Sequence, residues 1–259
     1  MLKYDYLESN KEKFRLMYLA ARPFPHLQLL EVCDDKKLKV VYDELPPLNN
    51  KSRDLVFAKN KFEKSNYGTL HPYLKELYED LRSDRFNNFL SYISGGKDVF
   101  IDPRNYGGGL HQGRGQSKLD MHLDFNYHPE NKLWYREMNV LLYMNEDWKP
   151  EHGGQLEIRD LRTDEETSID VSWNSMIIQQ CSNYSLHGYS LTSFPEGKNR
   201  TSIATYAYTK HVRHLENPRT TDWFVDGNES LFKKWLGRNI SSILKIKHLF
   251  AKSGTSKNY

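Results

Sequence analysis

The sequence has few cysteines and no long apolar run. Cys33 and Cys181 are the only two cysteines among 259 residues, too few for a disulfide framework, which favours a reducing compartment. No stretch approaches the roughly 20 apolar residues that cross a bilayer. Residues 1–13 are too polar for a secretory signal peptide. We therefore expect a cytoplasmic protein.

The sequence also lacks a strong net charge of either sign. The net charge is +3, and no phosphate-binding fingerprint or nucleic-acid motif is evident. The basic excess lies in residues 210–259, which carry ten Lys/Arg and four Asp/Glu. Within them, residues 228–251 alternate apolar and basic side chains at helical spacing. This segment is predicted either to touch an anionic or membrane surface peripherally or to pack on the core.

The first part of the chain is predicted to be mostly helical. Apolar spacing and proline breaks favour helices at residues 1–22, 34–45 and 69–95, and a short strand at 25–32. Residues 48–68 are polar and lack a sustained period. We interpret them as a loop near the substrate entrance.

After this helical part, the sequence changes to short runs of β-branched and aromatic residues, which are separated by Gly, Asn and Asp. Strands are predicted at 119–124, 139–145, 155–160, 168–171, 175–180, 184–188 and 200–208. About eight strands would form a double-stranded β-helix, or jelly roll. The expected fold is therefore mainly β with flanking helices (α+β). We predict a support region at 1–97, a catalytic jelly-roll core at 98–210 and a basic helical extension at 211–259.

One spacing in the sequence indicates a metal-binding site. His122 and Asp124 lie two residues apart in a predicted strand, so both side chains point to the same face. His187 comes from a later strand, as expected when a barrel brings distant strands together. Two imidazoles and one carboxylate leave open positions on a metal ion, an arrangement suited to iron(II) oxygenases.

Arg200 stands thirteen residues after His187 in a strand of alternating apolar residues. An inward guanidinium is costly unless it meets a carboxylate, which its planar fork binds in bidentate fashion. The carboxylate is predicted to belong to a cosubstrate, with Tyr143 adding a hydrogen bond. The alternative is a salt bridge within the protein.

Taken together, the motifs resemble the prolyl 4-hydroxylase-like branch of the iron(II)/2-oxoglutarate dioxygenases over about residues 23–210. The matching elements are RPFPH at 22–26, GGGLHQ at 107–112, HLDFNYH at 122–128, REMNVLLYMNEDW at 136–148, GGQLEI at 153–158, and LHG followed by NRTSIATYAYT. The resemblance implies a hydroxylase that uses Fe(2+), 2-oxoglutarate and dioxygen, with ascorbate as the expected reductant.

The resemblance also implies roles for individual residues. His122, Asp124 and His187 would bind iron, while Arg200, Tyr143 and Ser202 would bind 2-oxoglutarate. Gln112 stands near where the family often has a tyrosine, and its amide could replace that hydrogen bond. The substrate would lie against Arg136, His128 and Asn126.

Several alternatives remain open. His122, Asp124 and His128 form a rival ligand set, and His111 and His152 are expected to be structural. A prolyl residue or proline-like group is the first expected substrate; a cell-envelope sugar, a lipid-linked group or a small molecule is the alternative. A non-catalytic jelly-roll binding protein is the competing class.

Overall fold

The chain folds around one antiparallel sheet. The computed structural model describes residues 1–51, 56–225, 230–237 and 239. Its strands are β1 His26–Leu30, β2 Ala58–Lys64, β3 Phe100–Ile101, β4 Gly109–Leu123, β5 Trp134–Tyr143, β6 Leu156–Asp160, β7 Glu166–Ile169, β8 Ser175–Gln180, β9 Ser185–Tyr189, β10 Asn199–Lys210 and β11 Asp222–Phe224. The helices are α1 Tyr4–Ser9, α2 Lys11–Ala20, α3 Asp35–Glu44, α4 Pro72–Asp80 and α5 Asp84–Ser94.

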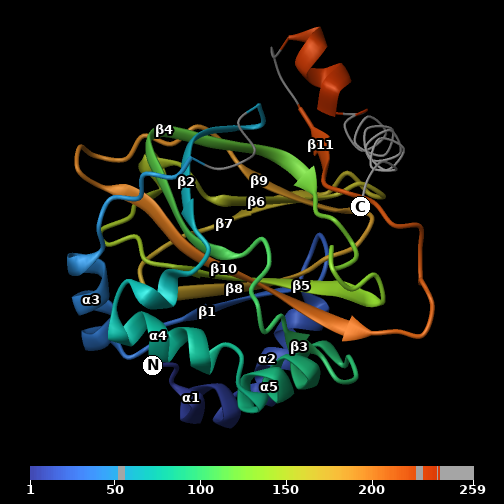
Figure 1. Cartoon of the computed structure of the whole chain (residues 1–259), viewed down its shortest axis with the longest axis horizontal. Coiled ribbons are helices and arrows are strands. Elements are labelled where there is room, and N and C mark those ends of the chain that lie inside the picture. Colours follow the sequence, from blue (N-terminus) through green and yellow to red (C-terminus); the bar gives the residue numbers. More distant parts are fainter. Residues whose placement is uncertain (52–55, 226–229, 238, 240–259) are drawn as a thin grey trace, which may run out of the picture.

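The sheet folds over into two layers (Figure 1). Its strand order is β1-β8-β5-β10-β4-β9-β6-β7, and β2 and β11 also pair with β4. The first half of β4 pairs with β10, whereas its second half pairs with β9. One long strand therefore belongs to both layers, and this closes the predicted jelly roll.

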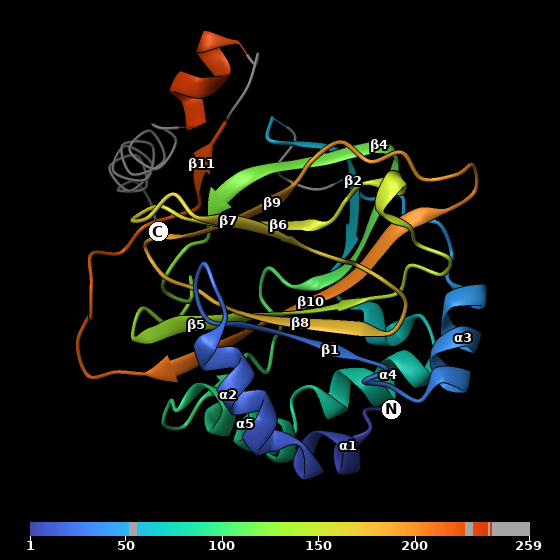
Figure 2. The ribbon, with the colours of Figure 1, turned by 180° about the vertical axis from the view of Figure 1, so that it is seen from behind.

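Four of the described helices cover the outer face of the β1-β8-β5-β10 layer. Figure 2, seen from behind, shows α1, α2, α4 and α5 on the side of β1 and β8 that faces away from β6 and β7. Along β5, Val140 and Leu142 pack in the core beneath the helices, whereas Leu141 and Tyr143 pack with residues of the second layer. This alternation follows from the two-residue period of a strand. Full burial of each such aliphatic side chain stabilises the fold by about 1.5–3 kcal/mol.

Most predicted elements are confirmed. The predicted helix at 34–45 is α3, and Asp34 caps it by accepting a hydrogen bond from the backbone N–H of Lys37. The predicted strand at 175–180 is β8. The jelly roll emerges from the seven predicted runs, with longer strands at β4 and β5 than expected.

One expectation is wrong: residues 48–68 are not a loop throughout. They contain β2, which pairs with β4 along almost its whole length. The strand has no regular alternation because its register shifts between Lys59 and Lys61, and Asn60 between them has a positive φ of 50°. A strand with an irregularity and mostly polar side chains does not show the period of two on which strand prediction relies.

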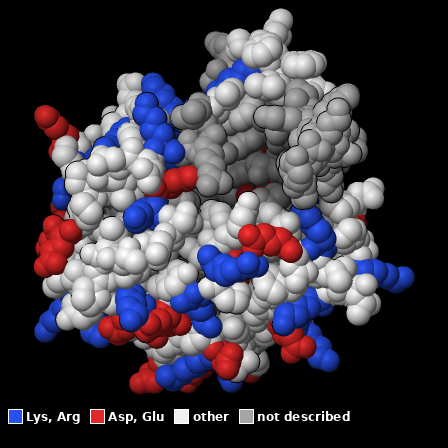
Figure 3. Space-filling model, in the orientation of Figure 1, with Lys and Arg blue, Asp and Glu red and all other residues white. Residues whose placement is uncertain are grey.

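The chain continues past β10 as an irregular segment over residues 211–221 and then β11. Residues 231–237 are helical, but most of the amphipathic segment 228–251 lies outside the described residues, so its surface contact stays a prediction. None of the described helices has the length and apolar composition needed to cross a membrane. On the face drawn in Figure 3, basic and acidic side chains are interspersed.

Candidate metal and cosubstrate site

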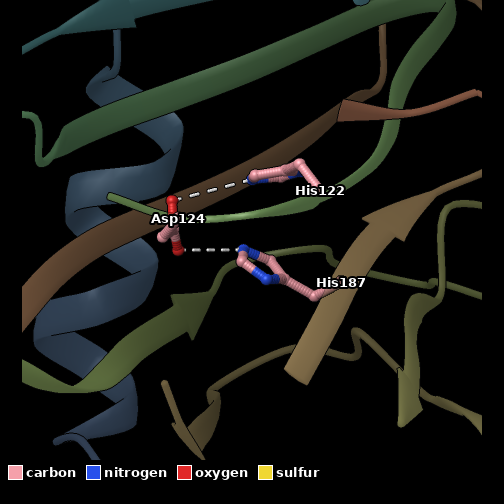
Figure 4. A group of neighbouring side chains, drawn as sticks. All are labelled: His122, Asp124 and His187. Carbon is pink, nitrogen blue, oxygen red and sulfur yellow. Dashed lines mark ion pairs between the residues drawn. The ribbon is translucent and has the colours of Figure 1, made fainter. Parts of the chain in front are cut away.

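Three side chains meet between the two layers. His122 lies near the end of β4, Asp124 follows that strand directly, and His187 is the residue opposite His122 on β9. The Nε2 atom of His187 is 3.3 Å from Asp124 Oδ2, and that of His122 is 3.8 Å from Asp124 Oδ1. Figure 4 shows both rings pointing at the carboxylate. The predicted trio therefore comes together, with its ligand atoms within 4.8 Å of one another.

The imidazole of His122 is fixed in orientation. Its Nδ1 donates to the backbone carbonyl of Asp120 at 2.9 Å, which leaves the Nε2 lone pair facing the site. Trp223 of β11 lies opposite His122 in register, and the two ring centroids are 4.6 Å apart. Phe57 stacks on Trp223, with the two ring centroids 4.6 Å apart. Aromatic packing from the C-terminal segment thus supports this ring.

The charges of the trio suit a cation. Burial lowers the pKa of His187 to about 3, so its ring is neutral near pH 7 and keeps a lone pair for a metal. Burial alone would raise the pKa of Asp124, but Arg136 and the two histidines hold it below the usual range. A carboxylate with two imidazole groups is a donor set that fits iron(II) and leaves coordination positions open.

Two residues of β5 support Asp124. Arg136 Nη2 and Asn139 Nδ2 each donate to Asp124 Oδ2 at 2.8 Å. Arg136 Nε also donates to Asn139 Oδ1 at 3.0 Å, and Asn139 Nδ2 lies 3.4 Å from His187 Nε2. The guanidinium lies over the rings of Phe125 and Tyr206. Because Oδ2 is held by two donors, Oδ1 is the oxygen left for a metal.

Asn139 was not predicted, and the register explains why. Residues three apart in a regular strand face opposite sides. Met138 and Arg136 of β5 lie opposite consecutive residues of β10, so that Glu137 between them has no partner. This irregularity brings Arg136 and Asn139 to the same face. The sequence carries no clear signal for it.

We predict that Arg136→Met lowers the free energy of unfolding of the metal-free protein by about 3–5 kcal/mol, because Asp124 then remains buried without its cationic partner. A saturating divalent metal should recover part of the loss, since the ion supplies a positive charge. Urea unfolding with and without Mn(II) measures both values. Arg104→Met, at a surface pair whose arginine is 61% exposed, should cost less than about 1 kcal/mol. Equal losses in the two variants would contradict the assigned role.

Arg200 lies in the same cavity and is buried. Its Nε donates to the carbonyl of Gly154 at 2.7 Å, its Nη2 donates to Tyr143 Oη at 3.3 Å, and the guanidinium lies 3.9 Å from the centre of the Tyr189 ring. Within the described residues no carboxylate pairs with it. The alternative, an internal salt bridge of Arg200, therefore has no acidic partner among the described residues. A buried cation without such a partner fits an anionic ligand.

The second glycine of the GG motif is explained by this arginine. Gly154 has a φ of +75°, and a Cβ placed there would lie 3.0 Å from Arg200 Cδ and 2.8 Å from the side chain of Thr192. Only glycine allows the backbone carbonyl to approach the guanidinium this closely. Ser202, two residues along β10, lines the same cavity, as do His111 of β4 and Lys61 of β2.

Three predicted contacts are not brought to the cavity. Gln112 points to the opposite side of β4 from His111 and Gly113, and its Oε1 accepts from the backbone N–H of Leu48 at 2.9 Å. The expected cosubstrate contact is therefore wrong, because alternate residues of a strand face opposite sides. Asn126 instead binds the segment after β10, donating to the carbonyl of Asn217 and accepting from the N–H of Arg219.

His128 is also remote from the site. It is fully buried, its Nε2 donates to Asp102 Oδ2 at 3.2 Å, and its Nδ1 accepts from the N–H groups of Glu130 and Asn131. Both ring nitrogens are satisfied. His128 is thus a structural residue of the turn after β4, and neither the rival metal-ligand set nor the predicted substrate contact is formed.

The fold and the site define a class: a jelly-roll domain in which two histidines and one aspartate form a candidate site for a single metal ion. Residues 106–208 match the sequence model of the 2OG-Fe(II) oxygenase superfamily. This segment contains all three candidate ligands and Arg200. Over these residues, about two fifths of the chain, the sequence is similar to that superfamily, and the match supports an enzyme of the iron(II)- and 2-oxoglutarate-dependent dioxygenase type.

Solved structures share the fold. A prolyl hydroxylase from Trichoplax adhaerens, in complex with a hypoxia inducible factor peptide, has a TM-score of 0.53 at 12% identity, over 80% of this chain and 93% of that one. A Pseudomonas putida prolyl-4-hydroxylase gives 0.52 at 15%, over 76% and 99%. HygX from Streptomyces hygroscopicus, with nickel and 2-oxoglutarate bound, gives 0.51 at 11%, over 78% and 88%. A search of curated protein sequences finds no match.

Proposed function

We propose that this dioxygenase hydroxylates a prolyl side chain or a proline-like group. The observation that carries the hydroxylase assignment is the pairing, within one cavity, of the His122, Asp124 and His187 trio with a buried arginine that has no carboxylate partner among the described residues. The first element fits iron and the second fits the far carboxylate of 2-oxoglutarate. A structural metal site would need only the first.

In this proposal His122, Asp124 and His187 hold the iron ion, which with 2-oxoglutarate and dioxygen supplies the oxidising chemistry. Arg200 and the hydroxyl groups of Tyr143 and Ser202 bind the far carboxylate and thereby orient the oxo-acid. Burial of the site keeps water out and strengthens these charged contacts. Arg136 and Asn139 keep one oxygen of Asp124 aimed at the ion.

A prolyl substrate is supported by two considerations. Several structures with this fold are prolyl hydroxylases. The cavity wall also offers apolar surface from Leu119, Leu141 and Leu156, against which an uncharged ring could lie. We propose Arg136, beside Tyr206 in that wall, as a residue on the substrate side.

The test is coupled turnover. The protein with iron(II), 2-oxoglutarate, ascorbate and dioxygen is incubated with a set of proline-containing peptides and with free proline. Succinate should form in a one-to-one ratio with a product heavier by one oxygen atom. The same peptides with alanine in place of proline should give only background succinate.

A parallel set of sugars and aminoglycosides separates the two substrate classes, since HygX has also been solved with hygromycin B bound. Coupled turnover with a sugar, and none with any prolyl compound, would overturn the prolyl assignment and leave the dioxygenase class intact. Failure to form succinate with any substrate or without one would count against catalysis itself.

A further inference from the structure

β2 brings a lysine to the cosubstrate side of the cavity. Gly113 of β4 is paired with Arg200 of β10 on one side and with Lys61 of β2 on the other. Residues directly opposite one another in neighbouring strands share a face of the sheet. Arg200 and Lys61 therefore flank a position that has no side chain. Both residues line the cavity.

The glycine between the two cations is required by the packing. A Cβ at Gly113 would lie 2.3 Å from Ser117 Oγ and 3.4 Å from Arg200 Cβ. Only glycine therefore fits beside the Ser117 side chain at this position, and it adds no side chain of its own between Arg200 and Lys61.

The register shift in β2 determines which lysine of this strand faces the cavity. Lys59 and Lys61 would share a face in a regular strand. Lys59 pairs with Lys118 before the shift, is exposed and donates to Gln116 Oε1 at 3.3 Å. Lys61 pairs with Gly113 after the shift, is half-buried, and has no ion pair or side-chain hydrogen bond within the described residues.

The surroundings of Lys61 carry surplus positive charge. The pKa of His111, which also lines the cavity, is held well below its usual value by burial, by Lys61 and by Arg200. Asp124 is the one carboxylate among the described cavity-lining residues, and its Oδ2 is already held by Arg136 and Asn139. Two cations without a carboxylate fit an anionic ligand group.

We propose that Lys61 is a second cationic contact for the far carboxylate of 2-oxoglutarate, and so a specificity-determining residue for a 2-oxo acid that carries a second negative charge. This inference rests on the proposed use of Arg200. The guanidinium fork sets the orientation of the carboxylate, and the ammonium adds a point charge from the β2 side.

The experiment removes the charge from the protein and from the ligand in turn. Calorimetric titration of the Mn(II)-loaded full chain, under anaerobic conditions, measures the Kd of 2-oxoglutarate and of 2-oxopentanoate, in which a methyl group replaces the far carboxylate. Lys61→Met keeps the aliphatic stem and removes the charge. It should raise the Kd of 2-oxoglutarate about tenfold and change that of 2-oxopentanoate less than twofold.

Two further variants make the result specific. Lys61→Arg should restore most of the affinity for 2-oxoglutarate. Lys59→Met, the same charge loss on the exposed side of the same strand, should leave both ligands unaffected. Equal weakening of both ligands by Lys61→Met, an effect of Lys59→Met as large, or no effect of Lys61→Met would each overturn the inference. A wild-type protein that does not prefer 2-oxoglutarate over 2-oxopentanoate would instead contradict the proposed role of Arg200.

Discussion

An Asp124→Ala protein is expected to bind iron(II) at least about a hundredfold more weakly than the wild type, and to form no succinate above background. Asp124 is the only anionic ligand of the trio. Its removal leaves two imidazole rings, which carry no negative charge, and places Arg136 beside the site without its counter-charge, so that a cation is repelled. Metal affinity by competition with a chromogenic chelator, and succinate by mass spectrometry, measure the two effects.

Asp43→Ala provides the matched control, because Asp43 is a half-exposed carboxylate of α3 that does not line the cavity. It should retain both metal affinity and turnover. Wild-type affinity or persistent succinate formation in Asp124→Ala would show that the iron lies elsewhere. Loss of both properties in Asp43→Ala as well would point to a general failure of folding.

Arg200→Met is expected to raise the Kd of 2-oxoglutarate by about a hundredfold or more, while metal binding stays within a few-fold of the wild type. A bidentate, buried charge pair contributes far more than a surface one. The affinity for 2-oxopentanoate should change little, because that acid has no far carboxylate to lose. Titration of the Mn(II)-loaded protein with each acid gives both constants.

Stability separates this role from a structural one. In the protein without ligand, Arg200 is buried and has no carboxylate partner among the described residues, so its replacement by an apolar side chain should leave the free energy of unfolding unchanged or raise it. A loss of several kcal/mol in Arg200→Met would indicate an internal structural role. Arg22→Met, at a pair whose arginine is 68% exposed, should alter neither quantity.

Residues two apart in regular strands were predicted well. His122 and Asp124 share a face for that reason, and the jelly roll brings His187 opposite His122. The strand at Ser175–Gln180 is predicted from its apolar run Met176-Ile177-Ile178, whose side chains are all buried. Local periodicity sufficed wherever the strand pairing was regular.

Prediction failed where the pairing is irregular. Because Glu137 has no partner in β10, Asn139 lies on the same face of β5 as Arg136. Because the register shifts at Asn60, β2 and its Lys61 lack the alternation of polar and apolar residues from which a strand is predicted. The expected cosubstrate contact of Gln112 is wrong because its spacing to the iron ligands in the sequence does not determine which face of β4 it lies on. These contacts depend on which residues lie opposite one another, and that is a tertiary property.

The packing of Trp223 on His122 has a practical consequence for protein engineering. Both β2 and β11 lie outside residues 106–208, yet one supplies Lys61 and the other supports a candidate iron ligand. A fragment cut to residues 106–208 would lose Lys61 from the cavity wall and the packing of Trp223 on His122. Truncation designs therefore have to begin upstream of Phe57 and to end beyond Trp223.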